Sequence, residues 1–246
     1  MRLNINLKFK DCLNLPIQYN NILQAVILNW LDNENYQKFI HDCGFKFENR
    51  KYKLFTFSKI YGKFKIYRDK KIISFFDKAN FTVSSLEDRF LNYLVLNVIS
   101  KDNFKFGNNI VGIEGIESAY SKLSEKEIVY TKSPIVVYST FENYQGNKTY
   151  YYNPLESEFS ELIRRNLIHK YEAYYGAEPS DKYFSITPLY REKLKQRIVM
   201  YKGYVIKGWD GEFLIQGSKE LMDIAYNAGI GSKNSQGFGC IEIKRK

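Results

Sequence analysis

Hydrophobic and polar residues alternate in the first segment of the chain and then change to a helical period. Over residues 2–9 every second side chain is apolar, which is typical of a half-buried strand. Over residues 19–31 the apolar side chains recur three and four positions apart, on one face of a helix. We therefore predict a strand followed by an amphipathic helix, and no secretory signal peptide at the N-terminus.

The rest of the first half alternates strands and helices. A short helix capped by Asp32 or Asn33 carries Tyr36 in its buried stripe and stops at Gly44. The elements predicted after it are strands at 52–58, 63–68 and 71–76, a helix opening at Ser85, and a strand-rich stretch from 104 to 116. The order β-α-β-β-α-β is the split βαβ, or ferredoxin-like, arrangement.

The second half repeats this order of elements without repeating the sequence. A helix is predicted from Pro154, at its first position, to Tyr175 before Gly176, and another begins after a cap at Ser218. The predicted strands of this half are 127–138, 183–187, 196–207, 212–216 and 238–244. We predict an α+β fold of two tandem ferredoxin-like units, residues 1–120 and 121–246.

A glycine-rich segment, residues 229–239, lies between the last predicted helix and the last strand. Its glycines are Gly229, Gly231, Gly237 and Gly239. Glycine permits positive φ and lets a backbone approach a ligand closely. The polar residues between the two glycine pairs offer N–H groups and one cation, which suits a phosphate backbone. The segment lacks the Gly-Lys-Ser/Thr ending of a Walker loop and the third glycine of a dinucleotide fingerprint.

The end of the same segment resembles the main RNA-binding strand motif of an RRM. The match runs from Gly237 to Ile243. That motif requires stacking aromatic residues where Cys240 and Ile243 stand. A generic tandem RNA-binding protein of the RRM type therefore remains an alternative supported by this match alone.

Charge favours a polyanionic partner. The formal net charge is +10, and residues 44–71 carry ten Lys or Arg against two acids, interleaved with aromatic rings. Phosphates attract the cations and unpaired bases stack on rings, so this window suits RNA. The alternative is a basic protein whose rings form the inward faces of strands.

Other classes are disfavoured by composition. Cys12, Cys43 and Cys240 are odd in number and show neither a disulfide nor a zinc pattern. No apolar run approaches the roughly 18 residues that span a membrane. We expect a cytoplasmic protein without a metal site or cofactor.

Three motifs together resemble one known family. They are the glycine-rich segment, His41 with Lys53–Ser58 after it, and Ser133–Val137. Two glycine-hydrophobic-glycine groups separated by five polar residues resemble the C-terminal loop of the RAMP superfamily of CRISPR-associated RNA-binding proteins. The similarity is greatest to the repeat-RNA-processing endoribonuclease, the sixth Cas family, and covers essentially the whole chain.

The resemblance implies a reaction and its residues. The family cleaves precursor CRISPR RNA within repeats without metal, by attack of a 2′-hydroxyl that leaves a 2′,3′-cyclic phosphate and a 5′-hydroxyl. His41 stands where relatives have a general acid/base, and Lys53 where a lysine stabilises the developing charge. Leu28 stands where many relatives have a tyrosine. Either His41 and Lys53 suffice, or a group such as Tyr36 takes that role, although Tyr36 also fits the core.

The resemblance also implies RNA-binding residues and partners. The residues expected to contact RNA are Gly229, Gly231, Lys233, Asn234, Ser235, Gly237 and Gly239, with Arg191, Lys193, Lys195 and Arg197. The expected partner is CRISPR repeat RNA; effector-complex subunits and a second copy of the chain are further alternatives. His169 is interpreted as part of a solvated basic helix face, with RNA contact as the alternative. A non-catalytic RAMP-fold subunit that binds guide RNA is the main competing function.

Overall fold

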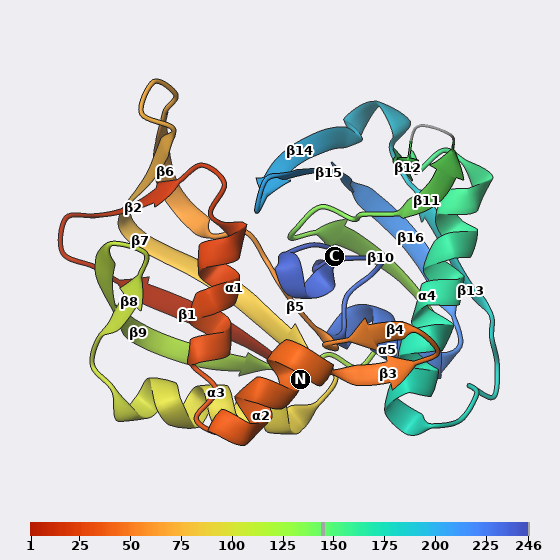
Figure 1. The fold of residues 1–246 in the computed structure, drawn as a ribbon, viewed down its shortest axis with the longest axis horizontal. Coiled ribbons are helices and arrows are strands. Elements are labelled where there is room, and N and C mark those ends of the chain that lie inside the picture. The colour runs from red at the N-terminus through yellow and green to blue at the C-terminus, as the bar shows by residue number, and fades with distance from the viewer. Residues whose placement is uncertain (144–145, 246) are drawn as a thin grey trace.

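The fold consists of two antiparallel sheets with helices packed against them (Figure 1). The computed structural model describes residues 1–143 and 146–245. In Figure 1 most of the N-terminal unit, red to yellow-green, lies on the left, and the C-terminal unit, green to blue, lies on the right. The orange hairpin of residues 45–52 is the exception and lies on the right, against the C-terminal unit. The fold class predicted from the sequence is confirmed, because each unit carries the two helices and the central sheet of a ferredoxin-like fold.

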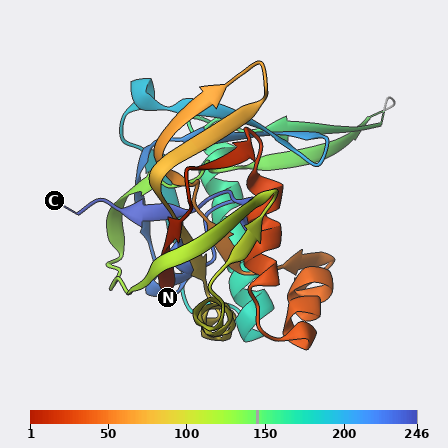
Figure 2. The same cartoon turned by 90° about the vertical axis from the view of Figure 1, so that its left-hand side faces the viewer.

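The N-terminal sheet has the strand order β2-β7-β1-β9-β8, with β5 and β6 also pairing with β7. Its strands are β1 Arg2–Lys8, β2 Cys12–Pro16, β5 Phe55–Phe57, β6 Tyr61–Tyr67, β7 Ile72–Ser85, β8 Phe104–Phe106 and β9 Asn109–Ala119. The helices are α1 Asn20–Asn29 and α3 Asp88–Ser100. Figure 2 looks onto this unit and shows α3 end-on beneath the sheet, with α1 beside it. Strand β2 was not predicted.

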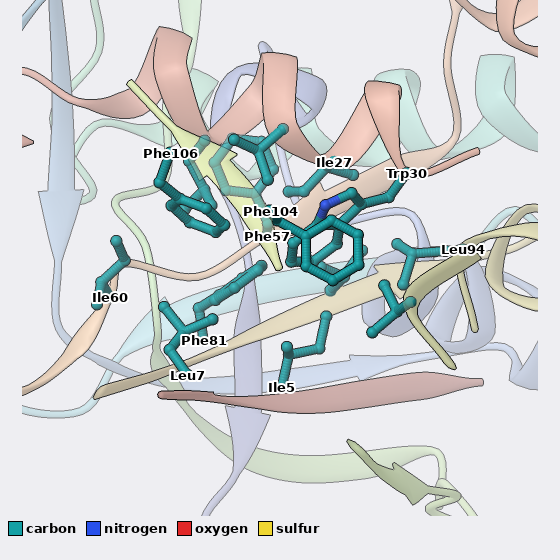
Figure 3. Packing of buried hydrophobic residues seen from close by; sticks show 14 of the residues in the cluster. Ile5, Leu7, Ile27, Trp30, Phe57, Ile60, Phe81, Leu94, Phe104 and Phe106 are labelled. Carbon is teal, nitrogen blue, oxygen red and sulfur yellow. The ribbon is translucent and has the colours of Figure 1, made fainter. Parts of the chain in front are cut away.

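Aromatic packing fixes α1 on this sheet. The Trp30 ring lies 5.0 Å from the Phe104 ring and 6.0 Å from the Phe81 ring, centroid to centroid. Figure 3 shows Ile27 and Trp30 pointing from α1 toward Ile5 and Phe81 of the sheet. The apolar face predicted from the sequence is therefore the buried face of α1.

A short helical stretch and a small hairpin connect α1 to the rest of the N-terminal sheet. Helix α2, Glu34–Lys38, continues as a π-helical turn over Phe39–Cys43, and strands β3, Phe45–Phe47, and β4, Arg50–Tyr52, follow. Of the two predicted caps, Asp32 and Asn33, the structure uses Asn33, whose Oδ1 accepts a hydrogen bond from the Tyr36 N–H at 2.8 Å. Gly44 ends the turn with φ +60°, as predicted.

The C-terminal sheet has the strand order β13-β16-β10-β17. Its strands are β10 Lys126–Thr131, β13 Phe184–Pro188, β16 Glu212–Gly217 and β17 Ile241–Ile243, and its helices are α4 Ser157–Tyr175 and α5 Lys219–Asn227. Two hairpins are added to it: β11 Tyr138–Asn143 with β12 Gly146–Tyr151, and β14 Lys195–Tyr201 with β15 Tyr204–Asp210. Single 3₁₀ turns lie at Arg191–Lys193 and Asn234–Gln236.

Three boundaries in the second half were predicted wrongly. The segment 127–138 is not one strand, because the N–H groups of Lys132 and Ser133 turn to the Cys240 carbonyl and the chain leaves the sheet. The segment 196–207 is a hairpin, because Lys202 and Gly203 both have positive φ and make a two-residue turn. Pro154 lies in a turn before α4, not in its first position.

Buried polar contacts join the two units. Arg2 of β1 is 1% exposed, and its guanidinium donates to the carbonyls of Tyr226 and Ile241 in the C-terminal unit. The same guanidinium stacks 3.3 Å from the Tyr226 ring centroid. These contacts fix the relative position of the two sheets.

Two glycines with similar positive φ test how closely the N-terminal unit packs against the glycine-rich segment. A Cβ at Gly237, φ +85°, would lie 2.5 Å from Phe57 Cε2, whereas a Cβ at Gly176, φ +70°, would have nothing within 4 Å. Gly176→Ala should cost about 1–2 kcal/mol of unfolding free energy from backbone strain alone. Gly237→Ala should cost about 1–3 kcal/mol more, because the added methyl overpacks the interface. Urea unfolding measures both; equal losses would contradict this packing.

Candidate functional site

A cleft of about 750 Å³ lies between the two units. Its walls come from β4 of the N-terminal unit and from β11, α4 and the glycine-rich segment of the C-terminal unit. The cations among its lining residues are Arg50, Lys51, Lys53, Arg165, Lys170 and Lys233. No Asp or Glu is found among the described residues that line it. Such a cleft attracts a polyanion, because no carboxylate among these residues neutralises the cations or repels the ligand.

His41 and Lys53 meet at the edge of this cleft. Lys53 lines the cleft, and its Nζ donates to the His41 carbonyl at 2.9 Å. His41 lies in the π-helical turn and is 66% exposed, with Nδ1 2.6 Å from Asp42 Oδ1. The hydrogen bond with His41 is the main reason that the pKa of Asp42 is lowered. This contact orients the imidazole and leaves Nε2 available to a substrate.

Lys53 is held in a partly desolvated position. Burial lowers its pKa, Asp42 counteracts this, and the cation of Lys202 lowers it further. Lys202 belongs to the turn between β14 and β15, so the tip of that hairpin adds positive charge beside Lys53. A half-buried cation is a stronger electrostatic partner for a developing negative charge than a fully solvated one.

Tyr36 does not face this centre. Its side chain is 6% exposed, and its hydroxyl donates to Glu87 while Arg89 covers the ring. Burial and the Glu87 contact raise the pKa of Tyr36. This geometry favours the core interpretation of Tyr36. Leu28 is also buried, at 7% exposure, in the hydrophobic cluster of the N-terminal unit.

The four glycines of the glycine-rich segment face protein atoms. A Cβ at Gly229 would lie 2.9 Å from Thr56 Cβ, at Gly231 2.5 Å from the Val136 carbonyl, and at Gly239 1.9 Å from the Ile230 carbonyl. All four glycines are buried. The missing side chains of Gly229 and Gly237 permit packing against the N-terminal unit, and those of Gly231 and Gly239 permit packing within the C-terminal unit. Gly231 also lines the cleft, together with the half-buried polar residues Ser232, Lys233, Ser235 and Gln236. Contact between the four glycines and RNA stays a prediction.

Side chains of the N-terminal unit hold the segment from one side. Asn20 of α1 donates to the Gln236 carbonyl at 3.0 Å, and Gln24 donates to the Ser235 carbonyl at 2.6 Å. Gln24 also accepts a hydrogen bond from the Tyr201 hydroxyl of β14. Helix α1 therefore connects the glycine-rich segment to the β14–β15 hairpin.

Two residues of the C-terminal unit hold the segment from the other side. Lys170 of α4 donates from Nζ to the carbonyls of Gly229 and Gly231 and to Asn234 Oδ1. Asn234, predicted to contact RNA, is 8% exposed and performs this structural contact. Sequence analysis missed Lys170, although a signal exists: it follows Ile163 and Leu167 on the buried stripe of α4.

His169 lines the cleft, and the simple solvated helix face expected for it is wrong. Its ring lies 5.0 Å from the Phe47 ring, centroid to centroid. Burial lowers its pKa, and Arg50 and Arg165 lower it further. A neutral imidazole among cations can accept or donate a hydrogen bond without adding charge.

The basic stretch of the C-terminal unit lies outside the residues that line the cleft. Arg191, Lys193, Lys195 and Arg197 are all exposed. Arg197 Nε pairs with Asp210 Oδ2 at 2.7 Å, and Lys59 of the N-terminal unit pairs with the same carboxylate at 2.6 Å. Arg197 is therefore partly neutralised, whereas ion pairs involving Arg191, Lys193 and Lys195 are absent from the described part of the chain.

The aromatic window predicted for RNA divides into two parts. Phe55 and Phe57 are buried in the core, as expected if the rings form the inward faces of strands. Phe64 of β6, in contrast, is 54% exposed, and Tyr61 and Tyr67 are also exposed.

Among the residues described, no group of three or more His, Cys, Asp or Glu forms a candidate metal site. Likewise, the helices described include none with the length and apolar character needed to cross a membrane.

Comparisons with known proteins agree with this arrangement. The model of the family described as CRISPR associated protein Cas6, C-terminal, matches residues 118–243, just over half of the chain. The chain is similar to the CRISPR-associated endoribonuclease Cas6 1 of Methanocaldococcus jannaschii, with 28% identity over 98% of this chain and 92% of the relative. It is also similar to the putative CRISPR-associated endoribonuclease-like protein Cas6nc of Pyrococcus horikoshii, with 29% identity over 99% of each.

Solved structures resemble the whole fold. One, described as a Cas6-related gene product from Pyrococcus furiosus, aligns with a TM-score of 0.86 and 25% identity over 100% of this chain and 99% of its own. Another, described as an RAMP protein binding different RNA substrates, aligns with a TM-score of 0.84 and 26% identity over 100% of both chains. By its sequence match and by its fold, the chain belongs to the Cas6 family of CRISPR-associated proteins.

Proposed function

We propose that this chain is an endoribonuclease that cuts precursor CRISPR RNA within its repeats, without a metal ion. The observation that carries the proposal is the contact of Lys53 with His41 at the edge of a cleft whose described lining residues include cations and no acids. Relatives named as CRISPR-associated endoribonucleases, similar over most of their length, support the same activity.

The substrate supplies the nucleophile in the proposed reaction. The 2′-oxygen next to the scissile phosphate bonds to phosphorus, and the bond from phosphorus to the 5′-oxygen breaks. The 2′-hydroxyl loses a proton, the leaving 5′-oxygen gains one, and the products are a 2′,3′-cyclic phosphate and a 5′-hydroxyl. The enzyme therefore has to align the RNA, transfer protons and stabilise charge.

His41 and Lys53 divide this work in our proposal. The His41 imidazole, oriented by Asp42, transfers a proton through its free Nε2. The half-buried Lys53 ammonium stabilises the charge on the pentavalent phosphorus. Residues 1–120 thus carry the catalytic pair, and residues 121–246 contribute most of the cleft that holds the RNA.

A second candidate function is guide-RNA binding without cutting. The observation that favours it is Leu28, an apolar buried residue at the position where many relatives carry a tyrosine. Such a subunit would bind repeat RNA through the same cleft and release no product.

Cutting assays separate these two functions. Wild-type protein with labelled RNA spanning two repeats, in EDTA, should give one cut per repeat. His41→Ala should lower the single-turnover rate by about 100-fold or more, because proton transfer by a side chain contributes that much. Lys53→Met should lower it by a similar factor through lost charge stabilisation. Analysis of the product ends should detect the cyclic phosphate.

Lys182→Met is the matched control, because Lys182 forms an exposed ion pair with Glu178 outside the residues that line the cleft. It should cut like wild type. Tight binding with no cutting by the wild type would refute the catalytic proposal in favour of the binding subunit. Cutting that disappears in EDTA and returns with Mg²⁺ would refute metal independence.

Tyr36→Phe tests the exclusion of Tyr36 from catalysis. Removing the hydroxyl leaves the buried Glu87 carboxylate without one donor, so the free energy of unfolding should fall by about 1–3 kcal/mol. The cutting rate at a temperature where the variant is folded should stay within about threefold of wild type. A rate loss equal to that of His41→Ala, with unchanged stability, would reinstate Tyr36 as a catalytic group.

A further inference from the structure

Lys170 is a buried residue whose ammonium donates hydrogen bonds to the glycine-rich segment. Its side chain is 3% exposed. Nζ donates to the Gly229 carbonyl at 2.7 Å, to Asn234 Oδ1 at 2.8 Å and to the Gly231 carbonyl at 3.1 Å. The three protons of the ammonium thus have three oxygen acceptors, and none of these acceptors is a carboxylate.

Such a residue is costly for the fold. Desolvation of an ammonium without a carboxylate partner disfavours the charged form, and burial lowers the pKa of Lys170 to about 7. A methionine of similar length at this point of the apolar stripe would avoid that penalty. What lysine provides at this position, and an apolar residue cannot, is the set of hydrogen bonds to the glycine-rich segment.

The three hydrogen bonds set the shape of the segment through Asn234. With Oδ1 on Lys170, the Asn234 amide donates from Nδ2 to the Ile230 carbonyl at 3.0 Å and to the Phe238 carbonyl at 3.1 Å. Ile230 and Phe238 are the central residues of the two glycine-hydrophobic-glycine groups. Lys170 and Asn234 therefore clamp the two groups together from behind.

The clamp presents the front of the segment to the cleft. Between the two groups, Lys233 takes a left-handed φ of 62°, and its Nζ lies 5.0 Å from the Tyr138 ring centroid. Lys233, Ser232 and Ser235 are half-buried residues of the cleft wall, whereas the Lys170 side chain, which also borders the cleft, is only 3% exposed. The nearly covered Lys170 ammonium thus holds the segment that places the more accessible Lys233 cation.

We propose that Lys170 is a positioning residue for RNA: its ammonium holds residues 229–239 in the conformation that binds RNA, without contacting RNA itself. The inference rests on the proposed function, because it assumes that this cleft receives RNA. It concerns affinity and not the chemical step, since His41 and Lys53 belong to the other unit.

The first test compares binding with cutting. Lys170→Met, with Lys182→Met as control, is titrated against a repeat RNA made non-cleavable by a 2′-deoxy nucleotide at the cut site. Lys170→Met should weaken binding by about tenfold or more, the change that about 1.4 kcal/mol produces. Its single-turnover rate on cleavable RNA at saturation should stay within about threefold of wild type. Wild-type affinity in Lys170→Met, or a rate loss without an affinity loss, would overturn the proposal.

A chemical-rescue experiment asks whether the charge itself matters. Lys170→Ala leaves room behind the segment for a small cation. Added propylamine, protonated at neutral pH, should restore part of the RNA affinity, whereas n-propanol at the same concentration and ionic strength should not. Equal effects of the amine and the alcohol would show that only the volume matters and would overturn the role of the ammonium.

Asn234→Ala keeps the proposal testable if the Lys170 variants do not fold. It removes one acceptor of the Lys170 ammonium and the amide that donates to the carbonyls of Ile230 and Phe238. RNA affinity should therefore again fall by about tenfold. Wild-type affinity in a folded Asn234→Ala would contradict the clamp. A wild-type chain that does not bind repeat RNA refutes the proposed function, and the inference with it; wild-type binding with unaffected variants refutes the inference alone.

Discussion

The arrangement of the molecule depends on the close packing of the glycine-rich segment between its two sheets. Thr56 and Phe57 of the N-terminal unit and Val136 of the C-terminal unit occupy the space that side chains at Gly229, Gly237 and Gly231 would need. Because interiors are packed as densely as organic crystals, a methyl added at such a contact has no free space and forces the backbone or the side chains of the facing unit to move. The segment therefore acts as a spacer that fixes the distance between the walls of the cleft.

That constraint connects the proposed catalytic pair to the proposed RNA-binding wall. Lys53 lines the cleft from the N-terminal unit and contacts His41 at its edge, and Lys233 and Ser235 line it from the C-terminal unit. Gln24 of α1 donates to the Ser235 carbonyl, so a direct hydrogen bond joins the N-terminal unit to the RNA-binding wall proposed here. A shift of one unit would change the placement of RNA relative to His41, and positioning errors of about 1 Å are enough to slow an enzyme.

Local patterns predicted the helices and the central strands, since period and capping are properties of neighbouring residues: the Ser218 side chain caps α5 as expected. They did not predict the added hairpins, because hairpin formation depends on pairing with distant strands. They predicted the positive φ of the glycines but not the atoms that pack against them. The apolar stripe of α4 indicates that Lys170 is buried, but its partners in the glycine-rich segment and the packing of His169 on Phe47 depend on distant residues and could not be derived from the sequence. The motif around His41 identified the candidate catalytic pair, but only the structure showed Lys53 donating to the His41 carbonyl.

The central claim is that repeat RNA lies in the cleft between the units. A non-cleavable repeat RNA carrying 4-thiouridine at successive positions, irradiated in complex with the protein and followed by peptide mass spectrometry, tests it most directly. The account predicts cross-links to both walls, in peptides containing residues 50–53 and 232–236, from nucleotides near the cut site. Cross-links from those nucleotides confined to surfaces away from the cleft, such as α3, would contradict it.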